Sequence, residues 1–424
     1  MTPDEKRLFA QSFPIHVGVD TGKLFHVLVA RGPDGRRSKP FRAVVSRPGF
    51  EAAEAHLRGL FGAAGPARFL VGLEFAGHHG FTFARFLADR GYHVVNVLPA
   101  HTKRSKELED NTPLKSDAKD AAVVCALLGN GIFVRFPFLK PPYTELRLLT
   151  AHRHRLTVEA TRFKNRLQGL LDLAWPELLQ HFSGLHKVTP LALLERWPLP
   201  QDLLAAAPRT VRAFIRRSSR GHVSAERIAA LLADARATIA LPDAPTERRL
   251  EIQYLLARWR LVRAQLAELD RRITELVERC PEAKALLTVP EVSAVCAATI
   301  VAELGTPADY AHPRQVLKLA GMNLISHSSG QRDPTSVPKW QSKRGRPMLR
   351  RQLFLLAGRW CLARGLYRAE YEALLARNGH LRTQAVCALA RKLVPMLLKV
   401  MQSGEPFGRA RWQANRRRPD VVRV

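Results

Sequence analysis

Four carboxylates stand where chemistry is expected, at strand ends and at a helix start. Asp20 and Glu74 each close an apolar, strand-like run, and Asp117 and Asp120 follow Ser116, a residue type that caps helices well. The i, i+3 spacing places the last two acids on one helical face. Carboxylates that converge in this way repel one another unless divalent cations neutralise them. An all-oxygen ligand set suits Mg²⁺ or Mn²⁺ rather than zinc, and a pair of such ions supports phosphoryl transfer.

Each acid taken singly also has a structural explanation. Asp20 precedes Thr-Gly-Lys and is compatible with a turn, while Asp117 and Asp120 are compatible with first-turn acids that a helix dipole favours. Glu74 fits a structural role least, because a carboxylate after the apolar run 69–73 is costly to bury without a partner. The metal-site interpretation therefore requires all four acids to meet.

The elements around these acids predict an α/β domain. Three strands are followed by helix, strand, helix and strand, over residues 15–20, 24–30, 41–46, 52–60, 68–74, 81–90 and 92–98. Turn signals such as Pro33-Asp34-Gly35 separate the first strands. This order is expected of a ribonuclease-H-like sheet, although periodicity alone establishes only an α/β fold.

The middle of the chain is predicted to be helical. A long helix over 143–175 is followed by a separate helical stretch, 177–245, between proline-rich joints. Apolar residues from Ile252 to Leu276 then step by three and four residues over more than three heptads. A helix buried within one globule shows the same seam, but charged residues on the other faces favour a coiled coil, which predicts self-association.

Short helices and one polar loop are expected in the C-terminal part. Helices flank Pro290 within 286–304, and another covers 310–319. The segment 323–343 is rich in Ser, Gly, Gln and Pro and is expected to be an ordered loop. Helices then resume to about Gln402.

The composition excludes several classes of protein. The 424 residues carry 67 Lys and Arg against 37 Asp and Glu, a net charge of +30, which predicts a polyanionic partner such as nucleic acid. About half of this excess lies in 339–424, with 20 basic and 4 acidic residues. No apolar run is long enough for a membrane span, and no signal-peptide core is present, so export is not expected. Five scattered cysteines without a C-x-x-C pair favour a reducing cytosol over a disulfide framework or zinc ribbon.

The acids in their contexts resemble a known family. The segments HVGVDTGK, VGLEFAG and LKSDAKDA look like the acid motifs of the DEDD transposases of insertion-sequence family 110, which are bridge-RNA-guided serine recombinases of bacterial mobile elements. The resemblance implies a RuvC-like, ribonuclease-H-fold domain. It also implies that the catalytic ligands of Mg²⁺ or Mn²⁺ are Asp20, Glu74, Asp117 and Asp120.

The C-terminal part carries the rest of the resemblance. Residues 319–330 look like the family's Ser-Gly loop, which implies Ser329 as a nucleophile that forms a covalent phosphoserine with DNA. From composition alone a loop serine more often makes local hydrogen bonds, and because Ser328 precedes it the assignment depends on alignment to Gly330. The run from Ser342 resembles the family's SK-x-G…LRR pattern. Candidate phosphate contacts near it are Lys339, Lys343, Arg344, Arg346, Arg350 and Arg351.

One motif departs from the family pattern. Family members often have a Pro-Gly-x-Gly hairpin that contacts phosphate through backbone amides, whereas this chain reads Pro290-Glu-Val-Ser293.

The resemblance implies three domains and a recombinase. These are a RuvC-like domain over 1–138, a helical and coiled-coil region over 139–280 with an insert at 177–245, and a mostly helical transposase domain over 281–424. The implied partners are donor and target DNA, an element-encoded bridge RNA and further copies of the chain, as a dimer or tetramer in which the acids of one protomer act with the serine of another. The implied location is the bacterial cytoplasm at the nucleoid.

Two alternative functions stay open. One is a metal-dependent RuvC-like junction nuclease that uses water instead of Ser329. The other is a nucleic-acid-binding protein whose acids are catalytically inert.

Overall fold

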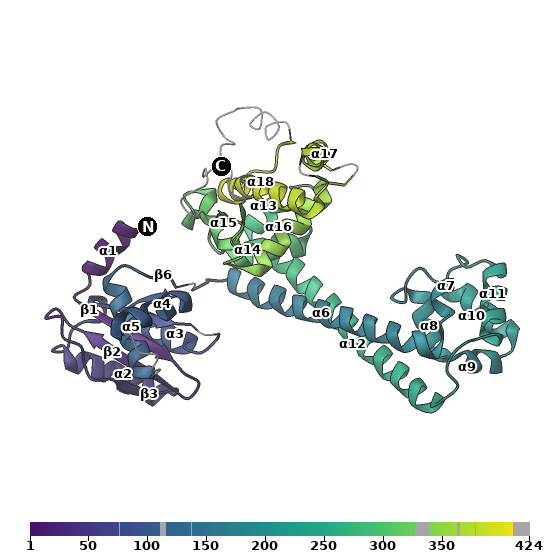
Figure 1. The fold of residues 1–424 in the computed structure, drawn as a ribbon, viewed down its shortest axis with the longest axis horizontal. Helices are drawn as coiled ribbons and strands as arrows, with labels where there is room; N and C mark the ends of the chain where they lie inside the picture. Colours follow the sequence, from purple (N-terminus) through teal and green to yellow (C-terminus); the bar gives the residue numbers. More distant parts are fainter. Residues whose placement is uncertain are drawn as a thin grey trace. The chain divides into compact units, whose positions relative to one another are not determined.

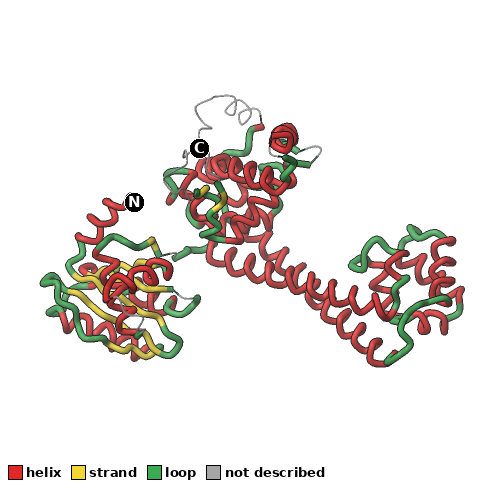
Figure 2. The backbone as a smooth tube through the Cα atoms, viewed as in Figure 1, coloured by secondary structure: helices red, strands yellow, loops and turns green. Residues whose placement is uncertain are grey.

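The computed structural model describes residues 1–75, 77–110, 116–136, 138–326, 339–362, 365–377 and 379–409. The chain divides into two compact units, Met1–Phe138 and Leu139–Val424 (Figure 1). The first is a mixed α/β body and the second is almost entirely helical (Figure 2). Within the described ranges, no helix is long and apolar enough to cross a membrane.

The first unit is built on a six-stranded sheet with strand order β3-β2-β1-β4-β5-β6. The strands are β1 (Ile15–Thr21), β2 (Phe25–Arg31), β3 (Phe41–Val44), β4 (Phe69–Glu74), β5 (His93–Val97) and β6 (Val134–Arg135). The first three form an antiparallel meander, β4 and β5 run parallel to β1, and β6 is antiparallel to β5. The α/β prediction is confirmed, and this strand order fits a ribonuclease-H-like sheet.

Helices cover both faces of this sheet. The helices of the unit are α1 (Pro3–Gln11), α2 (Arg47–Leu60), α3 (Phe81–Asp89), α4 (Pro99–Asp110) and α5 (Asp117–Gly129), with a short 3₁₀ turn at Pro66–Arg68. Because side chains alternate along a strand, Val17 and Val19 join Phe50 of α2 and Phe83 of α3 in one core. Gly18 faces the opposite side, where α5 crosses the sheet.

Two long helices form the central part of the second unit. α6 (Tyr143–Ala174) and α12 (Pro245–Glu278) run antiparallel, with Leu156 packed beside Val262 and Leu269. An ion pair joins Arg153 to Asp270. Part of the apolar seam predicted over 252–276 therefore packs against α6 of the same chain. The self-association predicted from this seam stays a prediction. A coiled coil in the strict sense stays a prediction.

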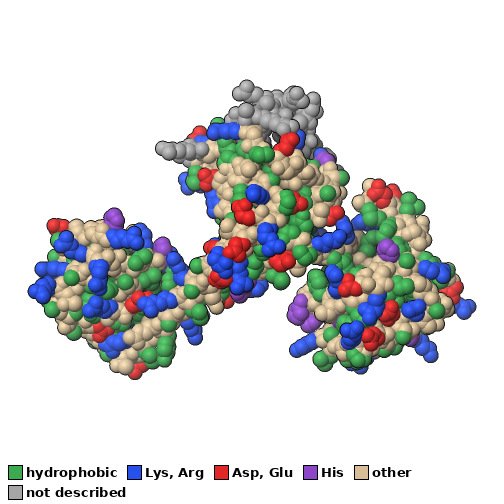
Figure 3. All heavy atoms as spheres, turned by 180° about the vertical axis from the view of Figure 1, so that it is seen from behind, with side chains coloured by type: hydrophobic (Ala, Val, Ile, Leu, Met, Phe, Trp, Pro, Cys, Tyr) green, Lys and Arg blue, Asp and Glu red, His purple; other side chains and the backbone are tan. Residues whose placement is uncertain are grey.

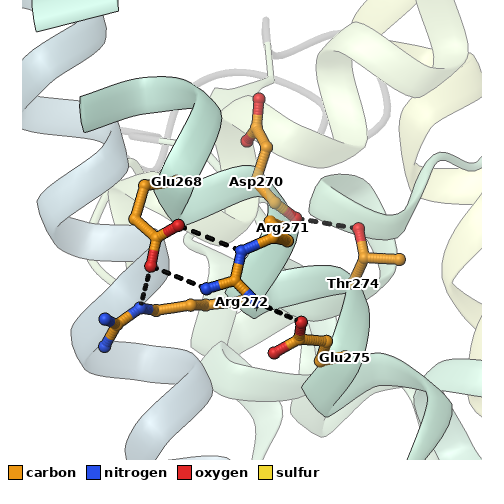
Figure 4. A network of polar contacts seen from close by, with 6 residues as sticks. All are labelled: Glu268, Asp270, Arg271, Arg272, Thr274 and Glu275. Atoms are coloured by element: carbon orange, nitrogen blue, oxygen red, sulfur yellow. Dashed lines mark hydrogen bonds and ion pairs between the residues drawn. The ribbon is translucent and has the colours of Figure 1, made fainter. Parts of the chain in front are cut away.

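The outer face of α12 is polar and internally paired. Arg271 donates to Glu268 at 2.8 and 3.0 Å and to Glu275 at 2.5 Å, and Arg272 donates to Glu268 at 2.6 Å (Figure 4). These contacts are spaced i, i+3 or i, i+4, as expected of a solvated helix face.

A separate group of short helices, here called the helical lobe, lies between α6 and α12 in the sequence. It comprises α7 (Leu178–His181), α8 (Val188–Arg196), α9 (Pro200–Ala205), α10 (Pro208–Ser218) and α11 (Ala225–Arg236). Its core contains Leu193, Leu203, Val211 and Ile215, all fully buried, together with the ends of α6 and α12. The segment 177–245 is thus helical, as its proline-bounded pattern predicts.

The C-terminal part of the second unit packs around one large apolar core. Its helices are α13 (Pro281–Leu286), α14 (Ala294–Leu304), α15 (Pro313–Ala320), α16 (Pro347–Trp360), α17 (Arg368–Arg377) and α18 (Arg382–Ser403), with a 3₁₀ turn at Pro307–Asp309. Two expectations need correction. The helix expected over 310–319 begins at Pro313, because His312 caps it. The segment 323–343 is not purely a loop, since β7 (Leu324–Ile325) and β8 (Trp340–Gln341) pair antiparallel.

Candidate active site

Asp20 and Glu74 are brought together by strand register. β1 and β4 are parallel neighbours, and Asp20 lies directly opposite Glu74. Residues opposite each other in a parallel pair point to the same face, here the face that α5 covers. The Thr21 hydroxyl donates a 2.7 Å hydrogen bond to the backbone carbonyl of Glu74, which ties the two strand ends together.

A pair of glycines allows α5 to pack closely against the sheet. Gly18 and Gly72 lie opposite each other in the same register, two residues before the two acids. A Cβ atom on Gly18 would lie 2.1 Å from the carbonyl oxygen of Ala121 and 2.3 Å from the amide nitrogen of Cys125. The helix therefore approaches the sheet more closely than any side chain at position 18 would permit.

This close packing places the first turn of α5 at the ends of β1 and β4. Ser116 caps the helix by accepting a hydrogen bond from the Lys119 amide at 3.2 Å. The first turn then carries Asp117, which is exposed, and Asp120, which is buried.

All four acids line one cavity of about 480 Å³. Its remaining lining residues are Thr21, Gly22, Lys23, Leu24, Phe25, Val27 and Lys106. The structure thus brings the four acids identified in the sequence to one place, from two strands and one helix.

The acids that line the cavity repel one another when they are charged. Burial, and then the negative charges of Asp120, Asp117 and Glu74, raise the pKa of Asp20 from 3.8 to about 6, while Lys106 opposes the shift. A raised carboxyl pKa in a cleft is typical of functional sites, since a folded chain gains no stability from such crowding.

Lys106 is the residue that sequence reasoning missed. It lies on α4, and its ammonium nitrogen is 2.5 Å from a carboxylate oxygen of Asp120. The sequence signal is weak, because Lys106 belongs to an ordinary basic run, Lys103-Arg-Ser-Lys106, whose position over the acids depends on how α4 packs against α5.

The four carboxylates are suitable ligands for a hard divalent cation such as Mg²⁺ or Mn²⁺. Four carboxylates supply only oxygen ligands, and their mutual repulsion is relieved by positive charge, which Lys106 provides in part. In the part of the chain that the structure describes, no three His, Cys, Asp or Glu side chains are already arranged tightly enough to hold an ion. We take Asp20, Glu74, Asp117 and Asp120 as the residues that would hold it.

Ser329 lies outside the described residues, as do Ser328 and Gly330. The described residues on either side are joined by the β7–β8 pair, in which Ile325 lies opposite Trp340. The Ser342 hydroxyl donates to the Asn323 side chain at 2.6 Å. The described residues on the two sides of the segment that contains Ser329 therefore lie next to each other.

The six candidate phosphate contacts fall into two groups. Lys339, Lys343, Arg344 and Arg351 are exposed. Arg346 instead points inward, donates to the backbone carbonyl of Glu303 and lies 3.9 Å from its carboxylate, and burial lowers its pKa. Arg350 donates to the carbonyls of Ala320 and Lys343. Arg346 and Arg350 thus hold the loop around Lys343 in place.

Lys and Arg side chains are spread over the visible face of each unit (Figure 3).

The Pro290–Ser293 segment contains a residue in the left-handed backbone conformation, although it has no glycine. The Val292 amide donates to the Val289 carbonyl, and Glu291 has a φ of 64°, a left-handed conformation that favours glycine. The indole of Trp360 and the guanidinium of Arg359 donate to the carbonyls of Pro290 and Glu291 and hold this turn.

Comparison with known proteins gives two matches to family models. A transposase model for the DEDD proteins of IS110 matches residues 17–176, and a model described as transposase IS116/IS110/IS902 family matches residues 283–372. The first range contains the four acids, and the second contains Ser329 and the six basic residues.

Two curated relatives resemble the chain over nearly its whole length. The 43.6 kDa protein of insertion element IS110 from Streptomyces coelicolor is 27% identical over 396 residues, which cover 92% of this chain and 94% of that protein. The 44.8 kDa protein of insertion element IS116 from Streptomyces clavuligerus is 26% identical over 404 residues, which cover 93% of this chain and 96% of that protein.

Proposed function

The chain belongs to the IS110/IS116/IS902 family of insertion-sequence transposases, and from this premise we propose that it cuts and rejoins DNA by serine attack, guided by an element-encoded RNA. The observation that carries the proposal is the meeting of four acids at one cavity, where burial and then the charges of the other three acids raise the pKa of Asp20 to about 6. A site that only bound nucleic acid would not gather four carboxylates beside a phosphate, because like charges repel.

The cavity residues have distinct roles in this proposal. Asp20, Glu74, Asp117 and Asp120 would hold Mg²⁺ or Mn²⁺, which supplies Lewis-acid polarisation of the scissile phosphate when bound. The hydrogen bond from Thr21 keeps the ends of β1 and β4 together before DNA arrives. Lys106 balances the buried charge of Asp120.

Ser329 is the proposed nucleophile. Its hydroxyl gives its proton to a base, its oxygen bonds to phosphorus, and the bond from phosphorus to a deoxyribose oxygen breaks as that oxygen takes up a proton. The phosphoserine retains the energy of the phosphodiester, so a hydroxyl of another strand reverses the step without ATP. The exposed residues Lys339, Lys343 and Arg344 lie on either side of β8 and are suited to holding the phosphate backbone.

The proposed organisation follows the three regions expected from the sequence. These are a RuvC-like domain over 1–138, a helical region over 139–280 with its insert at 177–245, and a transposase domain over 281–424. Donor and target DNA and a bridge RNA are the proposed partners, with two or four copies of the chain in the assembly. The bacterial cytoplasm, at the nucleoid, is the proposed location.

The test is covalent trapping on a nicked DNA substrate that carries an element end. The wild-type chain should form a protein–DNA adduct that maps by peptide mass to Ser329. Ser329→Ala should bind DNA and give no adduct, and the neighbouring Ser328→Ala, a matched loss of one hydroxyl, should keep substantial activity. Asp20→Asn should abolish the adduct while RNA binding is retained, since it removes one ligand and one charge.

Two outcomes would overturn the proposal. Strand cleavage that persists in Ser329→Ala without any adduct would identify a nuclease that uses water. A wild-type chain that binds DNA and RNA but never cleaves, with Mg²⁺ or Mn²⁺ present, would identify an inert binding protein. An adduct on Ser328 would move the nucleophile by one residue.

A further inference from the structure

The helical lobe lies outside both stretches that match the family models, which cover 17–176 and 283–372. It has its own apolar core, with Leu193, Val211 and Ile215 fully buried. Its outward surface is therefore not needed to build the acid cavity or the Ser-Gly segment, and its charge pattern requires a separate explanation.

One helix of the lobe, α10, carries a face of arginines. Arg209, Arg212 and Arg216 recur at i, i+3 and i+7, so they lie on one side of the helix, and all three are exposed. Val211 and Ile215 lie on the opposite side and are fully buried. Arg217 and Arg220 are also exposed beside this stripe. These five residues are here called the α10 arginine face.

None of these five arginines forms an ion pair with a described residue, and residues 138–326 are described throughout. Several arginines of α12 behave differently. Arg249 is 2.6 Å from Asp202, and Arg271 lies between Glu268 and Glu275 (Figure 4). Like charges at i, i+4, such as Arg212 and Arg216, destabilise an isolated helix. The α10 arginine face thus carries positive charge that no acidic side chain among the described residues pairs with.

We infer that the α10 arginine face binds the phosphate backbone of duplex DNA. Guanidinium groups match phosphate oxygens in planar, two-pronged geometry. The exposed residues between the arginines, Thr210 and Ala213, are small, so the helix can approach closely. An α-helix with side chains is about 10–12 Å across and fits the B-DNA major groove, about 12 Å wide.

Other polyanionic occupants fit this face less well. Single-stranded RNA is held largely by stacking on aromatic side chains, and Phe214, the one aromatic residue of α10, packs against Trp197 with ring centroids 5.1 Å apart. The deep, narrow major groove of duplex RNA does not admit a helix. A membrane surface requires exposed apolar residues beside the charges, and none of the large exposed hydrophobic side chains lies in α10.

This inference rests on the proposed function, because a chain that cuts and rejoins DNA must also hold DNA away from the cut. The two are tested by different readouts. Equilibrium binding of an unrelated DNA duplex reports on the α10 arginine face and needs no serine chemistry. A wild-type chain that binds duplex DNA through this face but forms no adduct would refute the proposed reaction and leave this surface in place.

The experiment compares two triple variants of the full chain by fluorescence anisotropy over a salt series. Arg209→Gln/Arg212→Gln/Arg216→Gln removes the stripe. Arg227→Gln/Arg236→Gln/Arg258→Gln removes three exposed arginines from α11 and α12 and has the same net charge. The stripe variant should bind at least about tenfold more weakly at physiological salt, and its log–log salt slope should be smaller by about 2–3, since each phosphate contact contributes about 0.9. The control variant should stay close to wild type.

Three results would overturn the inference. Equal weakening by both variants would mean that net charge alone binds DNA. An unchanged slope in the stripe variant would mean that these arginines contact no phosphate. Loss of single-stranded RNA binding with intact duplex binding would make RNA the occupant. If the triple variant unfolds, Arg212→Gln alone should still lower the slope by about 0.9.

Discussion

Replacing Gly18 by alanine should damage both the stability of the first unit and its chemistry. The new Cβ would lie 2.1 Å from the Ala121 oxygen and 2.3 Å from the Cys125 nitrogen, whereas real contacts of this kind start near 3.0 Å. Both neighbours are backbone atoms of α5, so no side-chain rotation relieves the clash. The helix must retreat by about 1 Å, because protein interiors are close-packed.

The size of the effect follows from two opposing contributions. Alanine in a strand is favoured over glycine by about 0.5–1 kcal/mol, because it loses less backbone entropy. Overpacking costs about 1–3 kcal/mol. Gly18→Ala should therefore lower the free energy of unfolding by about 1–2 kcal/mol. Since Asp117 and Asp120 move with α5, and a displacement of about 1 Å costs about 100-fold in rate, DNA cleavage should fall by about two orders of magnitude.

Gly59→Ala is the matched control. Gly59 lies in α2, where an added Cβ meets nothing within 4 Å, so alanine there should stabilise the unit by about 0.5–1 kcal/mol. All six tryptophans lie beyond residue 138, so tryptophan fluorescence during urea unfolding reports on the second unit and should not change. Amide exchange of α5 peptides reports on the first unit and should speed up only in Gly18→Ala. Unchanged α5 protection together with wild-type cleavage in Gly18→Ala would refute this account of the site.

Two further predictions concern the charges in the cavity, measured in buffer without divalent ions unless stated. Lys106→Met leaves buried Asp120 without its partner and should cost about 3 kcal/mol of stability. Added Mg²⁺ should raise the melting temperature of this variant more than that of the wild type, and equal shifts would contradict the proposed competition for Asp120. Asp20 has a folded pKa of about 6 against 3.8 for the free side chain, so the folded state holds an extra proton between these values and wild-type stability falls as pH rises through that window. Asp20→Asn has no carboxyl group to titrate at this position, so its stability should rise relative to that of the wild type from about pH 4 to about pH 6. If the stabilities of the two proteins change with pH in parallel, the pKa of Asp20 is not raised.

The α/β sheet and the meeting of the acids were predictable because both follow from local patterns. Strands β1 and β4 are largely apolar runs with a carboxylate at their last or next-to-last residue, and parallel strands place their ends at the same edge of a sheet. Ser116 marks the start of α5, and the i, i+3 spacing fixes the shared direction of Asp117 and Asp120.

The features that sequence reasoning missed depend on packing between distant segments. Gly18 and Gly72 look like ordinary strand glycines until α5 lies across them. Lys106 meets Asp120 only because α4 packs beside α5. The seam at 252–276 has the periodicity of any helix with one buried stripe, and periodicity does not say whether the partner helix belongs to the same chain.

The two halves of the proposed chemistry belong to different compact units. The acids lie in Met1–Phe138, and Ser329 lies in Leu139–Val424. In the proposed reaction each half needs the other: the acids would hold the metal ions, and a serine without nearby charge is a weak nucleophile at neutral pH. Lys106 offsets part of the negative charge of the cavity through its ion pair with Asp120. The proposed strand cleavage therefore requires the acids, the serine and the phosphate to meet. An α10 arginine face that holds DNA without reading its bases fits the proposed reaction, since it would raise the local concentration of substrate and leave the choice of site to the proposed guide RNA.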